Sequence, residues 1–75
     1  MSKSIVRTIR AGYTLTDLES GEEYFVLSST KMRGRQSYRV RCEETGAIRS
    51  FGRDAVLALQ EQGTLSVTLK GNFHG

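Results

Sequence analysis

Two short segments of the sequence alternate strictly between apolar and polar residues. The apolar positions are Tyr38, Val40 and Cys42 within Ser37–Cys42, and Leu65, Val67 and Leu69 within Thr64–Leu69. Successive side chains of a β-strand point to opposite faces, so a period of two predicts half-buried antiparallel strands. A chain with this pattern must bury one face of a sheet, and a mainly β structure is expected.

Glycine-containing turns divide the rest of the chain into further strands. The β-branched or aromatic segments Ile5–Arg10, Tyr13–Leu18 and Glu22–Ser28 have strand composition. Turns at Gly21 and Gly46 predict two hairpins, over residues 13–28 and 37–51. The polar segment Ser29–Gln36 between them is predicted to be a mobile loop.

One short helix is expected before the last strand. Asp54 is the predicted N-cap, Ala55–Gln62 are mostly good helix formers, and Gly63 suits the C-terminal position. Val56 and Leu59 are expected to face the sheet. A helix of about two turns must dock on other elements to be stable.

The expected fold class is mainly β with one short helix, in the order β-β-β-β-α-β, over a single small domain of residues 1–75. Its ordered core spans about residues 5–70, with flexible tails at 1–4 and 71–75. The helix position favours a small SH3-like or similar partly open antiparallel barrel, with an OB-like barrel or an open α+β sheet as alternatives. The predicted core consists of Ile9, Leu15, Tyr24, Val26, Tyr38, Val40, Ile48, Val56, Leu59, Leu65, Val67 and Leu69.

The charge is unevenly distributed along the chain. Eleven Lys and Arg residues against eight Asp and Glu give a net charge of +3, and no acidic residue lies between Lys31 and Arg41. Arginine presents a planar set of donors that suits phosphate oxygens and base edges. A nucleic-acid contact surface is therefore predicted at Lys31, Arg33, Arg35, Gln36, Arg39, Arg41 and Arg49, with DNA and RNA not distinguished.

The acidic turn supports a different function. Carboxylates cluster at Asp17, Glu19, Glu22 and Glu23. A protein-binding inhibitor or adaptor of a larger complex would dock through this turn or through a free sheet edge. A third interpretation is that both charge clusters only solvate a thin-cored domain. The sequence leaves open whether the chain is a monomer or a homodimer.

The residue types that carry catalysis and metal binding are sparse. His74 is the single histidine and has no ligand partner at zinc spacing, so neither a metal nor another cofactor is expected. Cys42 falls on the inward face of its strand, where a structural thiol with a raised pKa is expected. One cysteine fits a reducing, cytoplasmic setting. The chain has no membrane-length apolar run, and Met1–Arg10 lacks a signal-peptide h-region. A non-catalytic protein is predicted.

Overall fold

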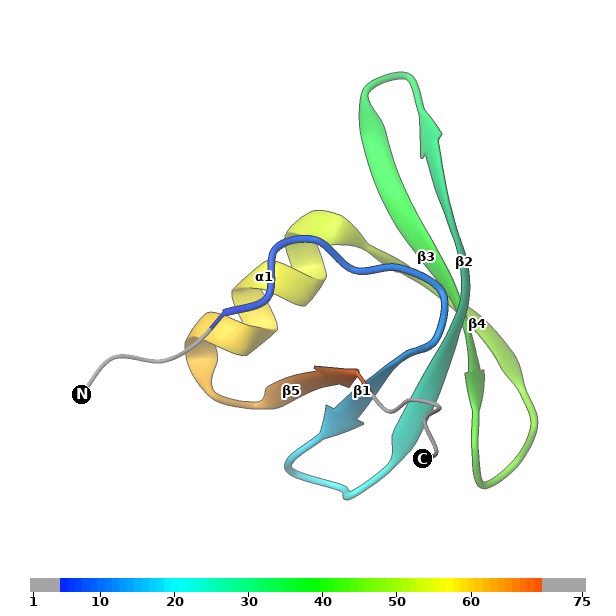
Figure 1. The fold of residues 1–75 in the computed structure, drawn as a ribbon. Helices are drawn as coiled ribbons and strands as arrows, with labels where there is room; N and C mark the ends of the chain where they lie inside the picture. The colour runs from blue at the N-terminus through cyan, green and yellow to red at the C-terminus, as the bar shows by residue number, and fades with distance from the viewer. Residues whose placement is uncertain (1–4, 70–75) are drawn as a thin grey trace.

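The computed structural model describes residues 5–69, which form one open antiparallel sheet and one short helix (Figure 1). The elements are β1 (Tyr13–Asp17), β2 (Glu23–Met32), β3 (Arg35–Cys42), β4 (Ile48–Gly52), α1 (Arg53–Gln62) and β5 (Leu65–Leu69). The predicted mainly β class with one short helix is confirmed. Residues 1–4 and 70–75, where flexible tails are predicted, lie outside the described residues.

The strands lie in the order β4-β3-β2-β1-β5 across the sheet. Consecutive strands β1 to β4 are neighbours, and α1 then carries the chain to β5, which pairs with the far side of β1. The helix ends at Gly63, whose φ of 83° places it in the left-handed region that glycine adopts without strain. Within residues 5–69, β4 and β5 are the sheet edges, and no helix is long and apolar enough to cross a membrane.

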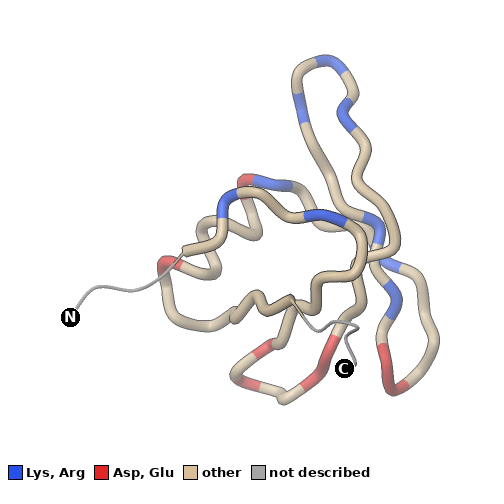
Figure 2. The backbone as a smooth tube through the Cα atoms, viewed as in Figure 1, with Lys and Arg blue, Asp and Glu red and all other residues tan. Residues whose placement is uncertain are grey.

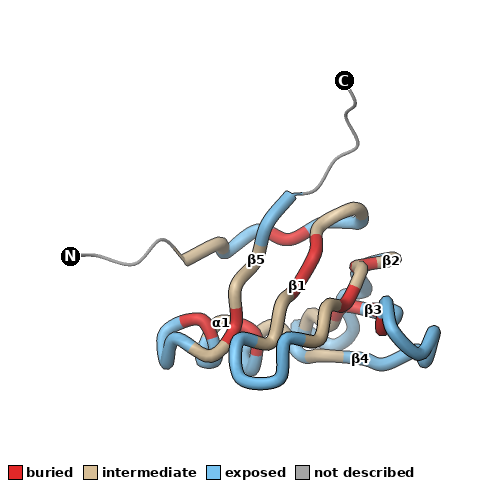
Figure 3. Tube along the Cα trace, turned by 90° about the horizontal axis from the view of Figure 1, so that it is seen from below, coloured by how far each residue is buried: buried red, intermediate tan, exposed pale blue. Residues whose placement is uncertain are grey.

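The core lies on the face of the sheet that α1 and the N-terminal segment cover. Its buried apolar side chains are Ile9, Leu15, Tyr24, Val26, Tyr38, Val40, Cys42, Val56 and Leu65. In β3 these alternate with exposed Arg39 and Arg41, so the predicted alternation of Ser37–Cys42 is confirmed. Figure 3 shows buried positions along the helix, the strands and the N-terminal segment, and exposed segments at the turns.

Three residues of the predicted core are exposed. Ile48 is 49% exposed because it lies opposite Arg41 on the solvent face of an edge strand. Leu69 is 66% exposed because it ends the last described strand, beyond the part of β5 where Leu65 is buried. Leu59 is 38% exposed because Val56 and the polar Gln60 are the buried residues of α1. The placement of all three in the core was wrong.

Gln60 is buried because it ties the N-terminal segment to the helix. Its Oε1 accepts a hydrogen bond from the Val6 N–H at 2.8 Å, and its Nε2 donates to the Val6 carbonyl at 2.9 Å. This pairing satisfies both halves of the amide in an otherwise apolar contact. Residues 5–10 are irregular and are not the strand that the sequence predicted, yet Ile9 still enters the core.

Candidate nucleic-acid interface

The segment predicted as a mobile loop is instead the outer half of a long hairpin, the β2–β3 ribbon. Backbone pairing continues from Ser29 opposite Tyr38 to Met32 opposite Arg35. Arg33 and Gly34 form the connection, with φ of 54° and 79°. Two consecutive positive φ values are typical of the type I′ turn that matches strand twist. The prediction was wrong because no core lies beneath this half of the hairpin, so its residues carry no apolar alternation.

The outer half of the ribbon projects from the body of the molecule (Figure 1). Every residue from Ser28 to Arg35 is exposed, and Met32 retains 65% of its surface. The Gln36 side chain crosses the ribbon and donates from Nε2 to the Ser29 hydroxyl at 3.0 Å. Lysine and arginine occupy both sides of the tip (Figure 2). The segment predicted as a mobile loop is therefore hydrogen-bonded along its backbone.

Strand register divides the predicted contact residues between two faces of the ribbon. Arg35, Arg39 and Arg41 alternate with the buried residues of β3, so they form one row on the outer face. Lys31 lies opposite Gln36, and both share the face of Tyr38. The register of β2 against β3 shifts between Val26, which lies opposite Val40, and Ser28, which lies opposite Arg39. Such a shift is typical of a β-bulge, in which one strand holds an extra residue.

Arg49 lies away from the row on the outer face. It is opposite Val40 in the β3–β4 register, whereas Ser50 is opposite Arg39. Arg49 is therefore on the core-side face of an edge strand, where its charge lowers the pKa of Tyr24 against larger opposing effects. It does not extend the surface that Arg39 and Arg41 form.

The acidic residues gather at the opposite end of the sheet. Asp17, Glu19, Glu22 and Glu23 occupy the β1–β2 turn and its borders, as the sequence indicates. The β3–β4 turn lies beside it, because the Glu43 N–H donates to the Glu23 carbonyl at 2.8 Å. Glu43 and Glu44 thus join the same acidic end (Figure 2). The sequence analysis missed these two because they follow the basic segment in the chain and become neighbours of the turn only through strand pairing.

Asp17 and Glu22 accept hydrogen bonds that shape this end of the sheet. Asp17 Oδ1 accepts the backbone N–H groups of Glu19 at 2.9 Å and Ser20 at 3.3 Å, which shapes the turn. Glu22 accepts a hydrogen bond of 2.6 Å from the Tyr24 hydroxyl, and this bond, followed by burial, raises the pKa of Tyr24 to about 12. The acidic end is therefore a hydrogen-bonded turn as well as a charged surface.

A pocket lies where the β2–β3 ribbon meets the first turn of α1. Its walls include Lys31, Gln36, Arg53 and Asp54. The helix starts two residues earlier than predicted, with Gly52 as N-cap in an extended conformation and no side-chain cap. Asp54 therefore lies within the first turn, and its predicted N-cap position was wrong. Arg53 was not among the predicted contact residues.

Cys42 is buried as predicted, at 4% exposure, but its pKa shifts in the opposite direction. Hydrogen bonds from the Thr45 side chain and backbone lower the pKa of the thiol and outweigh the opposing effect of burial. The sequence analysis considered burial and missed the turn that follows the strand, whose donors face the sulfur.

Within residues 5–69, His, Cys, Asp and Glu side chains form no cluster of three or more that could hold a metal ion. His74 lies outside the described range. Comparison with protein-family models, with curated proteins and with solved structures finds no match.

Proposed function

We propose that this protein is a non-catalytic nucleic-acid-binding or regulatory accessory protein that contacts phosphates with the β2–β3 ribbon. The observation that supports this most is the outer half of the ribbon, which is exposed along its length and carries Lys31, Arg33 and Arg35. Arg39 and Arg41 continue the cationic surface along the outer face of β3. No acidic residue interrupts the sequence between Lys31 and Arg41.

The separation of charge along the sheet supports an oriented encounter. Phosphates attract the cationic ribbon and repel the carboxylates of both turns at the other end. A two-stranded ribbon of this kind has the width to enter a nucleic-acid groove, and its arginines suit both phosphate and guanine. The ribbon backbone is already paired, so little chain entropy is lost on binding.

As the scaffold for this ribbon we propose the small SH3-like, partly open barrel. Two observations support it: α1 lies immediately before the last strand, and β1 pairs with both β2 and β5. In such a barrel the sheet curls, so that its edge strands approach each other and are protected from pairing with other chains.

A salt titration of binding to short single- and double-stranded DNA and RNA tests the proposed function. If Lys31, Arg33, Arg35, Arg39 and Arg41 all contact duplex phosphates, log K against log salt has a slope of roughly −4 to −5. Arg49→Gln is the matched control, because it removes the same charge from outside the ribbon and leaves this slope unchanged. Absence of binding to all four nucleic acids at low salt would overturn the proposal.

A protein-docking function is the second candidate, and the joined acidic turns favour it. Carboxylates from both turns form one surface, at which a basic partner protein would dock. Glu19→Lys combined with Glu44→Lys reverses charge there without removing the Tyr24 partner Glu22. This variant is expected to abolish partner capture in a pull-down if docking is the function, and to strengthen oligonucleotide binding if the first proposal is correct.

A further inference from the structure

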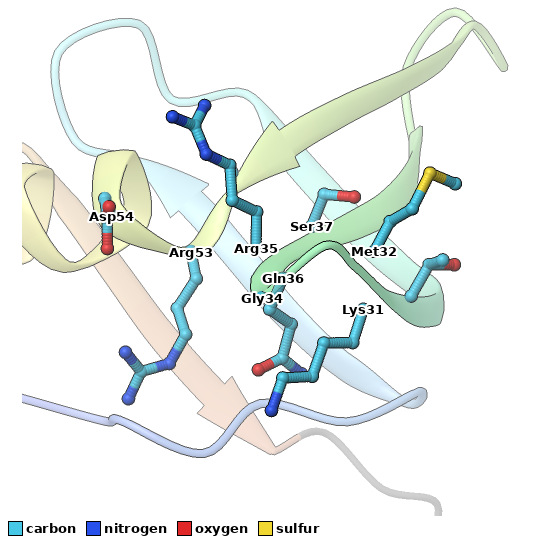
Figure 4. Close-up of a pocket in the computed structure, with 10 residues that line it drawn as sticks. Lys31, Met32, Gly34, Arg35, Gln36, Ser37, Arg53 and Asp54 are labelled. Carbon is cyan, nitrogen blue, oxygen red and sulfur yellow. The ribbon is translucent and has the colours of Figure 1, made fainter.

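The pocket between the β2–β3 ribbon and α1 brings together cationic groups that are distant in the sequence. Lys31 comes from β2 and Arg53 from the first turn of the helix. In Figure 4 the side chains of Lys31, Gln36 and Arg53 extend to the same side of the ribbon, whereas Arg35 extends to the other side. The pocket therefore offers two cations and an amide to a ligand on one side.

The start of α1 adds backbone donors to the same place. Gly52 and Arg53 line the pocket, and Gly52 has no side chain with which to cap the helix. The first amide N–H groups of a helix lack intrahelical acceptors, and they lie at the positive end of the helix dipole. Such groups bind anions well where side-chain cations accompany them.

A buried hydroxyl beside Arg53 is an independent indication of a missing acceptor. Tyr38 is 1% exposed, and its hydroxyl has no hydrogen-bond partner among the described residues. Burial raises the pKa of this hydroxyl and the Arg53 guanidinium lowers it, although the two groups do not meet the geometry of a hydrogen bond. Buried polar groups without a partner are rare and call for an explanation. Tyr38 does not itself line the pocket, and Arg53 is the residue that links its hydroxyl to an anion there.

Asp54 opposes an anion in the pocket. Its carboxylate lines the same cavity, one residue after Arg53. The site is thus one in which two cations and the helix N-terminus outweigh one carboxylate. This balance favours a multiply bonded anion such as a phosphate over a simple halide.

We propose that this pocket binds a single phosphate group, with Lys31, Arg53 and the first amides of α1 as its donors. The inference rests on the proposed function for the source of the phosphate, which is either an internal phosphodiester or the terminal phosphate of a nucleic acid. A phosphate seated here would fix the strand at the base of the ribbon while the tip contacts neighbouring phosphates.

The first test uses inorganic phosphate alone, titrated at constant ionic strength against chloride and followed by amide NMR. The backbone signals of Arg53, Asp54 and Ala55 and the side-chain amide of Gln36 are expected to shift together. Arg53→Gln and Lys31→Gln are each expected to weaken phosphate binding about tenfold, since each removes a charge-assisted hydrogen bond. Asp54→Asn is expected to tighten it, and Arg49→Gln to leave it unchanged. Absence of shifts at the pocket, or equal effects of Arg53→Gln and Arg49→Gln, would overturn the proposal.

The second test separates the two phosphate sources and the two proposals. An oligonucleotide with a 5′-phosphate is compared with the same oligonucleotide bearing a 5′-hydroxyl. If the 5′-phosphorylated oligonucleotide binds more tightly and Arg53→Gln removes this difference, the pocket binds a terminal phosphate. If the two oligonucleotides bind equally and Arg53→Gln weakens the binding of both, the pocket binds an internal phosphodiester. If inorganic phosphate shifts the pocket signals but no oligonucleotide binds, the phosphate site is supported and the nucleic-acid-binding function is overturned. If oligonucleotides bind wild type and Arg53→Gln equally, the pocket proposal falls and the function stands.

Discussion

The two halves of the β2–β3 ribbon are built from the same pair of strands but differ in almost every other respect. In the inner half, Tyr24, Val26, Val40 and Cys42 are buried against the helix and the N-terminal segment. In the outer half, every residue from Ser28 to Arg35 is exposed, and the charged residues are all cations. The backbone hydrogen bonds continue from one half into the other. We infer that the buried residues of the inner half carry stability and that the exposed cations, concentrated in the outer half, carry binding, so mutations separate the two.

The largest expected effect is on binding by the outer half. The triple variant Lys31→Gln, Arg33→Gln, Arg35→Gln removes three phosphate contacts, which lowers the salt slope by about 2.7 and the affinity at 0.1 M salt by about 500-fold. The unfolding free energy is expected to change by less than about 0.5 kcal/mol, because these side chains are exposed. Filter binding and urea unfolding measure the two quantities. A variant that unfolds much more easily would show that the outer half also stabilises the fold.

The matching change in the inner half is Val40→Ala. Val40 is fully buried, so loss of two methyl groups and the cavity left behind are expected to cost about 2 kcal/mol of unfolding free energy. For a domain of this size that lowers the melting temperature by about 10 °C. At a temperature where the variant is still folded, its affinity for nucleic acid should equal that of the wild type. Reduced affinity in the folded variant would break the separation of the two halves.

Arg33 offers a change that moves stability and binding in opposite directions. Its φ of 54° is one that asparagine tolerates better than arginine, and Asn-Gly is the preferred pair for this turn. Arg33→Asn is expected to raise the unfolding free energy by about 0.5 kcal/mol and to remove one phosphate contact, which costs about eightfold in affinity at 0.1 M salt. Arg33→Lys keeps the charge and the strain, so it serves as the control. Calorimetry measures the unfolding free energy and filter binding measures the affinity. If Arg33→Asn raised both quantities or lowered both, this prediction would be contradicted.

The smallest expected effect is on the unfolding free energy at alkaline pH, through Tyr24 in the inner half. Tyr24 has its pKa raised from 10.0 to about 12, chiefly by its hydrogen bond to Glu22. Because the folded pKa exceeds the unfolded one, this contribution to stability is complete below about pH 10 and is lost as pH rises toward 12. Urea unfolding at pH 8 and pH 11 is therefore expected to show a smaller alkaline loss for Tyr24→Phe than for the wild type. Equal losses in both proteins would show that the hydrogen bond does not persist in solution.

Sequence patterning predicted the inner half well and the outer half poorly, for one physical reason. Tyr38, Val40 and Cys42 alternate with arginines because one face of β3 is buried there, and burial is what leaves a period of two in a sequence. Residues 29–32 and 35–36 belong to strands with no buried face, and they are held by backbone pairing, the Arg33-Gly34 turn and the hydrogen bond from Gln36 to Ser29. Exposed Ile48 misled the analysis in the converse way, because an edge strand tolerates an apolar residue on its solvent face.

The candidate site was predicted in part. The sequence identifies the cations between Lys31 and Arg41, and alternation alone places Arg39 and Arg41 on one exposed face. It does not reveal that Arg53 joins Lys31 at a pocket, because that contact depends on where the helix starts relative to the ribbon. The same limit applies to Gln60, whose burial depends on the distant backbone of Val6.

The proposed binding surface consists of the outer half of the ribbon, the adjoining outer face of β3 with Arg39 and Arg41, and the start of α1. Amide NMR of the labelled protein titrated with a short oligonucleotide tests this placement most directly. We predict shifts concentrated at residues 29–41 and 53–55, with the turns at 17–23 and 43–46 unaffected. Shifts concentrated at the acidic turns or at the β4 and β5 edges would contradict it.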